Sequence, residues 1–160
     1  MVKRVWKALK PDDMAVVTNY LMELPDAERP LYGLTGIKTS FWSRIGGGAK
    51  PFVVLFTADR VILSKRSVGG IKQLWGDEHA LSDLVDLSTR KGPLLDSALF
   101  TFANEFRIRI GNIPHTQIAP VVGLMQEGVA ALEWSRLTDI QRTNCYYTFT
   151  MMKILPRDLL

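Results

Sequence analysis

A chain of 160 residues with 47% hydrophobic and 22% charged residues is predicted to form one globular domain whose core needs no disulfide or metal. Its single cysteine, Cys145, excludes an internal disulfide, and two histidines leave little material for nucleophilic catalysis. No apolar run approaches the ~20 residues of a spanning helix, and the basic N-terminus lacks a signal-peptide core. We therefore expect a cytoplasmic, non-enzymatic protein without cofactor or metal.

The net charge of +4 is unevenly distributed along the chain. Residues 1–72 carry 12 Lys and Arg against 6 Asp and Glu, whereas residues 73–160 carry 8 against 10. Residues 38–72 alone hold seven cations against one carboxylate, Asp59. Such a skew favours an anionic partner, namely phospholipid, nucleic acid or an acidic protein face. The alternative is a solvated basic face that keeps the protein soluble.

The hydrophobic period predicts a helix, then a series of strands, then a second helix. Met14, Val17 and Leu21 recur at helical spacing within residues 11–24, before Pro25. From residue 31 the period changes to two, and turn signals separate seven predicted strands: 31–43, 52–56, 60–65, 71–75, 81–90, 95–102 and 106–111. Residues 115–133 form the second predicted helix, with Thr116 as its N-cap. Its expected buried face is Ile118, Val121, Val122, Met125, Val129 and Leu132.

Two segments resemble a known family. Residues 54–62 read Val-Leu-Phe-Thr-Ala-Asp-Arg-Val-Ile, and residues 81–92 run into a Lys-Gly turn. Both are similar to strand–turn phrases of bacterial pleckstrin-homology-like (PH-like or GRAM-like) domains, and the resemblance covers about residues 31–133. It implies an α+β, mainly antiparallel fold: a two-sheet barrel or sandwich of about seven strands, capped by the C-terminal amphipathic helix. Residues 1–30 then form a basic segment and an extra helix, and residues 134–160 form an extension.

The resemblance also directs attention to the loop between the first two strands, because eukaryotic relatives often bind phosphoinositides there. Two aromatic side chains lie among cations in this loop, and further cations flank the next hairpin, which together give a candidate ligand- or membrane-binding set: Lys38, Phe41, Trp42, Arg44, Lys50, Lys65 and Arg66. The alternative is that the glycines at 46–48 make only a flexible hairpin. By strand alternation, Phe41 or Trp42 must point inward in either case.

An apolar tail follows the second predicted helix. Its large side chains are candidates for self-association: Tyr146, Tyr147, Phe149 and Met151. Cover for them comes either from a second subunit or from the N-terminal helix of the same chain.

The leading functional hypothesis is a non-enzymatic PH-like binding module, peripheral to the membrane, that recognises an anionic membrane surface or a protein partner. The alternative is a structural homo-oligomerisation subunit with no small-molecule ligand. Nucleic-acid binding is disfavoured because the aromatic residues are too few and too clustered for a stacking platform. Asp77, Glu78 and His79 are interpreted as a solvated loop, since no second histidine lies at metal-ligand spacing.

Overall fold

The computed structural model describes residues 9–38, 50–67, 72–156 and 158–160. Its three α-helices are Pro11–Glu23 (α1), His115–Glu127 (α3) and Asp139–Met151 (α4), and three short 3₁₀ helices are Leu81–Asp83 (η1), Gly128–Leu132 (η2) and Trp134–Arg136 (η3). The seven strands are Pro30–Lys38 (β1), Pro51–Thr57 (β2), Arg60–Arg66 (β3), Gln73–Ala80 (β4), Leu84–Arg90 (β5), Leu95–Phe102 (β6) and Arg107–Pro114 (β7). None of the described helices is long and apolar enough to cross a bilayer.

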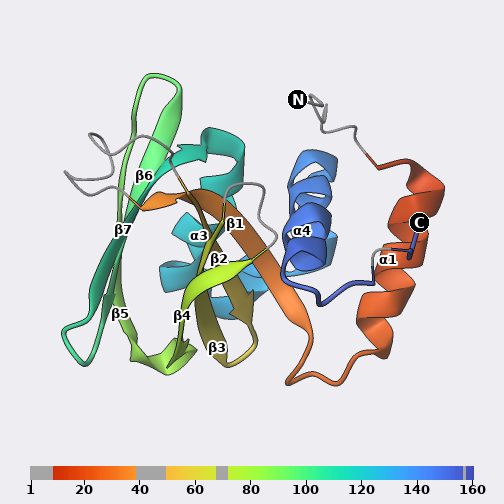
Figure 1. The fold of residues 1–160 in the computed structure, drawn as a ribbon, viewed down its shortest axis with the longest axis horizontal. Helices are drawn as coiled ribbons and strands as arrows, with labels where there is room; N and C mark the ends of the chain where they lie inside the picture. Colours follow the sequence, from red (N-terminus) through yellow and green to blue (C-terminus); the bar gives the residue numbers. More distant parts are fainter. Residues whose placement is uncertain (1–8, 39–49, 68–71, 157) are drawn as a thin grey trace.

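All seven strands belong to one antiparallel sheet in the order β4-β3-β2-β1-β7-β6-β5. The sheet curls into a half-barrel, with α3 against the β5–β7 portion (Figure 1). Its two edge strands, β4 and β5, are consecutive in the chain and joined through η1. Near this join His79 of β4 stacks on Phe102 and Phe106, with ring centroids 4.2 and 4.9 Å apart. The predicted α+β, mainly antiparallel fold of seven strands with a C-terminal helix is confirmed, but the strands form one curled sheet and not two.

Strand β2 is buried on both faces. Its continuous buried run, Phe52–Phe56, lacks the alternation of a half-exposed strand. One face points into the half-barrel, and the other is covered by α4, which packs on β1 (Figure 1). Gly33 of β1 permits this approach, because a Cβ at that position would lie only 2.5 Å from Thr148 Cγ2 of α4.

Helix α1 lies on the far side of α4 from the sheet (Figure 1). Its predicted buried residues, Met14, Val17 and Leu21, are buried. Two side-chain hydrogen bonds tie this part of the chain to the C-terminal region: Leu9 N–H donates to Thr143 Oγ1 at 3.4 Å, and Trp134 Nε1 donates to Thr18 Oγ1 at 2.9 Å. The N-terminal helix and the C-terminal extension therefore share one core with the sheet.

The second predicted helix is shorter than expected and turns a different face inward. Helix α3 ends at Glu127 because Gly128 has a φ of 68°, and a 3₁₀ helix follows. Its buried side chains are Gln117, Ile118, Val121 and Leu124, so the expected face is wrong at Val122, Met125 and Val129, which are exposed. The expected Thr116 cap is also wrong, since Pro114 occupies the N-cap position without a side-chain bond.

Strand boundaries differ from prediction at three places, one of which is β7, expected at 106–111 and found at Arg107–Pro114. The strand expected at 71–75 is Gln73–Ala80, so Asp77, Glu78 and His79 belong to β4 and not to a solvated loop. The strand expected at 81–90 begins at Leu84, after the 3₁₀ turn η1. Of the strand expected at 31–43, the part after Lys38 lies outside the described residues.

Candidate functional site

Three of the predicted binding lysines lie at one end of the sheet, and we call them the strand-end lysines: Lys38, Lys50 and Lys65. Ile37 pairs with Pro51, which brings the exposed Lys38 and Lys50 to the same strand ends. Lys65 pairs with Phe52, two residues along β2 from Lys50, and is half-buried. Phe41, Trp42 and Arg44, which were predicted to complete this set, lie outside the described residues.

Arg66 does not join the strand-end lysines. Its side chain points to the opposite face of β3 and the residue is only 5% exposed. The guanidinium donates from Nη2 to the carbonyl of Met151, at the C-terminal end of α4, at 2.8 Å. Burial lowers the pKa of Arg66 from its usual value. This arginine fastens α4 to the sheet, and the expectation that it adds surface charge is corrected.

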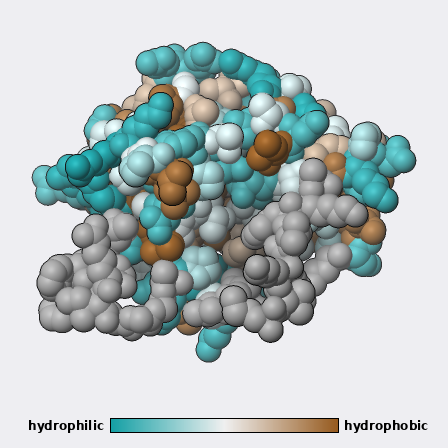
Figure 2. Space-filling view, turned by 90° about the horizontal axis from the view of Figure 1, so that it is seen from above, coloured by the Kyte–Doolittle hydropathy of each residue, from teal (hydrophilic) through white to brown (hydrophobic). Residues whose placement is uncertain are grey.

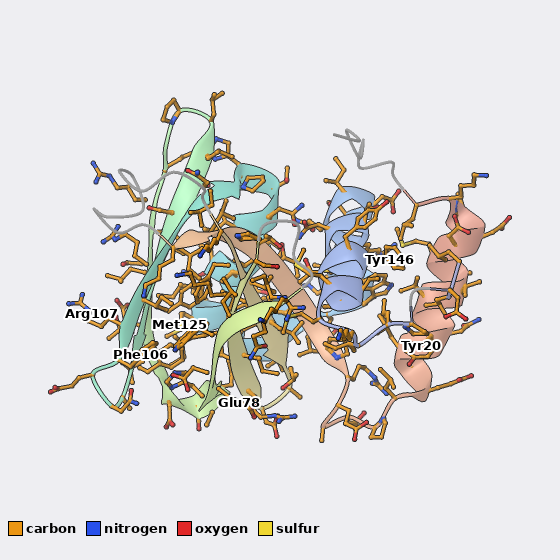
Figure 3. All side chains as sticks on the ribbon, viewed as in Figure 1. Tyr20, Glu78, Phe106, Arg107, Met125 and Tyr146 are labelled. Carbon is orange, nitrogen blue, oxygen red and sulfur yellow. The ribbon has the colours of Figure 1, made fainter. Side chains whose placement is uncertain are left out.

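The residues predicted for self-association belong to α4 and are covered by their own chain. Phe149 is fully buried and Tyr146 is buried, whereas Tyr147 and Met151 are half-buried. Figure 3 labels Tyr146 on α4 and Tyr20 on the neighbouring α1. The N-terminal helix α1 lies beside α4 and shares its core, as the alternative drawn from the sequence expects. Tyr146 and Phe149 therefore offer no surface to a second copy, and self-association through Tyr147 and Met151 stays a prediction.

A cleft of about 240 Å³ on β5, β6 and β7 holds a different set of cations. Arg90, Lys91 and Arg109 line it, and we call it the basic cleft. Arg109 points outward because its neighbours Ile108 and Ile110 point into the core. Arg90 reaches the same surface from the end of β5, where it pairs with Ser97, another lining residue.

The cations of the basic cleft form no close ion pair among the described residues, and Lys91 interacts with Asp96 only at longer range. Among the described residues, no Asp or Glu lies within salt-bridge distance of Arg90, Lys91 or Arg109. Asp96 lines the cleft, but His115 Nδ1 lies 2.7 Å from its Oδ1 and the Gly92 N–H donates to it at 3.2 Å. This close contact with His115 is the main cause that holds the pKa of Asp96 below its usual value. The cleft therefore presents positive charge to solvent.

A second cleft, of about 350 Å³, lies between β3 and β4 and has the opposite character. Its acidic lining residues, Asp77 and Glu78, are both engaged within the chain. Glu78 Oε1 accepts from Arg60 Nη1 at 2.7 Å, and Asp77 Oδ2 lies 2.9 Å from His79 Nε2. The ring of His79 is in turn stacked on two phenylalanines, so these polar groups hold the edge strand in place. The cations of the basic cleft, by contrast, form no salt bridge among the residues described.

The basic cleft was missed because charge was counted along the sequence. Arg90, Lys91 and Arg109 belong to the half of the chain with excess negative charge. A usable signal was present in the strict alternation of residues 106–110, which places arginines on the outer face of a strand. A second was the Lys-Gly-Pro turn at 91–93, which ends the preceding strand with two cations.

Comparisons with known proteins add little to this geometry. No family model matches the chain, and no curated protein matches it. Among solved structures, it is similar to the pleckstrin homology domain of USP37, at 13% identity and a TM-score of 0.39, over 65% of this chain and 98% of that one. A likeness of this degree transfers no ligand or partner.

Proposed function

We propose that the protein is a non-enzymatic binding module that attaches peripherally to an anionic membrane surface. The observation that carries this proposal is the basic cleft, which Arg90, Lys91 and Arg109 line without forming a salt bridge among the described residues. Near an anionic bilayer each Lys or Arg is worth about 1 kcal/mol. Three cations on one surface therefore contribute about 3 kcal/mol to reversible attachment, with an affinity that falls as salt rises.

The surface around the cleft supports the same proposal. Arg107 is exposed on β7 and points away from the molecule, as Figure 3 shows. Asp86 is the exposed carboxylate on β5 that partly offsets it. The strand-end lysines add further positive charge where β1 and β2 end, since Lys38 pairs with Ile110, between the cleft residues Arg109 and Gly111. Strand alternation gives Lys38 the inward side, so it flanks the cleft and does not line it.

The test is co-sedimentation of the full chain with vesicles of phosphatidylcholine alone or with phosphatidylserine. We expect binding only to the anionic vesicles. Its affinity should fall as the salt concentration rises from about 50 to about 300 mM, because the added ions screen the three to five lysine and arginine contacts. Arg90→Gln/Arg109→Gln removes about 2 kcal/mol, which is roughly a 30-fold loss of affinity.

The matched control is Lys10→Gln/Lys153→Gln, which removes the same charge from exposed positions beside α1 and α4. We expect this control to bind nearly as tightly as the unaltered chain. Equal binding to both kinds of vesicle, or equal losses in the two double variants, would contradict the proposal. An acidic protein would then become the better candidate partner.

A further inference from the structure

We infer that the turn between β5 and β6, residues 91–94, enters the lipid bilayer with Leu94 as the inserted side chain. This inference rests on the proposed function and adds to it the orientation of the protein on the membrane. The partner of this surface is then an anionic lipid bilayer and not a groove on another protein.

The turn between β5 and β6 exposes apolar side chains that do not pack in the core. Leu94 is 80% exposed and Leu95 is 41% exposed. A single exposed leucine is ordinary on a protein surface. Here Leu94 lies in the hairpin turn, and the adjacent Leu95 begins β6 and also lines the basic cleft. Figure 2 looks down on this end of the molecule and shows isolated hydrophobic residues on a largely hydrophilic surface.

The turn is held in shape before any partner arrives. The Gly92 N–H donates to Asp96, whose other contact, His115, begins α3. A side chain at Gly92 would collide with the carbonyl oxygen of Leu95, so the two strands approach closely here. Pro93 fixes its own φ. Because these constraints already order the turn, inserting Leu94 costs little further conformational entropy.

The cations are placed to accompany such an insertion. Arg90 and Lys91 immediately precede the turn, and Arg109 lies across the cleft on β7. Long basic side chains keep their charged ends in the polar layer while their stems lie along apolar surface. With Leu94 among the acyl chains, these three charges come level with the lipid phosphates. An apolar groove on a protein would bind the leucines but would not complement three exposed cations that form no salt bridge among the described residues.

Two measurements on the full chain test the inference. Leu94→Ser is expected to weaken binding to phosphatidylserine vesicles roughly tenfold. Met22→Ser, which alters a 64% exposed side chain on α1, is the matched control and is expected to leave binding unchanged. Thermal unfolding of both variants should match that of the unaltered chain, because neither side chain is buried.

The second measurement places an environment-sensitive fluorophore at the tip through Leu94→Cys. Cys145 will remain unlabelled, because it is buried and burial raises the pKa of its thiol to about 12. We expect a blue shift with anionic vesicles and quenching by nitroxides on the acyl chains. The same label at Met22→Cys should show neither.

The outcomes separate the two proposals. Binding that depends on Arg90 and Arg109, with Leu94→Ser neutral and no blue shift, overturns the insertion and leaves the membrane-binding function in place. No binding to anionic vesicles overturns both.

Discussion

The β1–β3 and β5–β7 portions of the sheet differ in what lies on their outer faces. Over β1–β3 that face is covered by α4, and every residue of the run Phe52–Phe56 is buried. Over β5–β7 it is open, and Leu84 is the buried residue of β5. We call these the covered half and the open half.

The cations of the two halves serve different purposes. In the covered half Arg60 pairs with Glu78, and Arg66 is buried against a carbonyl of α4. In the open half Arg90 and Arg109 have no acidic partner among the described residues and line a cleft. The comparison teaches that the number of cations along the sequence does not locate a binding surface. A binding surface is located by the cations that are neither buried nor paired with another group of the same chain.

The largest expected effect is in the covered half. Phe149→Ala removes a fully buried ring of α4 and should lower the free energy of unfolding by about 3–5 kcal/mol. Leu94→Ala, in the open half, should change it by less than about 0.5 kcal/mol. Urea denaturation followed by circular dichroism measures both. A small effect at Phe149 would mean that α4 is not part of the cooperative core, and the comparison would fail.

Much of the fold was predictable because period and punctuation are local properties. The bounds of helix α1 and of strands β2, β3 and β6 were predicted to within one or two residues. Each of these elements is an apolar segment bounded by proline, glycine or Asp-containing turns. The buried face of α3 was not predicted correctly, because Val122 and Met125 remain exposed on it and the helix ends at Glu127, before Val129. Periodicity shows that a helix has apolar side chains along one side, but it does not show which of two adjacent helical faces packs against the sheet.

The candidate site was less predictable because it depends on contacts between distant segments. Strand pairing alone could bring Lys38 and Lys50 together, but the fate of Arg66 depends on where α4 ends, 85 residues further along the chain. The basic cleft likewise needs β5 and β7 on either side of β6. Adjacent strands were predictable from the sequence, whereas the docking of α4 required the three-dimensional structure.

The same substitution at two arginines sharpens the comparison. Arg66→Met leaves the carbonyl of Met151 without this donor and should destabilise the protein by about 1–3 kcal/mol. Arg90→Met should leave stability within about 0.5 kcal/mol and instead weaken binding to anionic vesicles. Chemical denaturation measures the stability of both variants, and vesicle co-sedimentation measures their affinity for anionic vesicles. Destabilisation by Arg90→Met that equals that of Arg66→Met would remove the distinction between a structural and a free cation.

The smallest expected effect concerns Asp96, where the open half is anchored to α3. Its pKa is lower in the folded protein than in the unfolded chain, chiefly through the close contact with His115. The ionised carboxylate therefore contributes stability at pH values above its unfolded pKa, and this contribution disappears as pH falls through the folded value. Compared with Asp96→Asn, the unaltered protein should be more stable at neutral pH, and the difference should narrow in strong acid. Denaturation at a series of pH values between 7 and about 2 measures it. His115→Ala should reduce the same difference at neutral pH, because it removes the main donor. A difference that stays constant down to the lowest pH would show that this carboxylate does not anchor the turn.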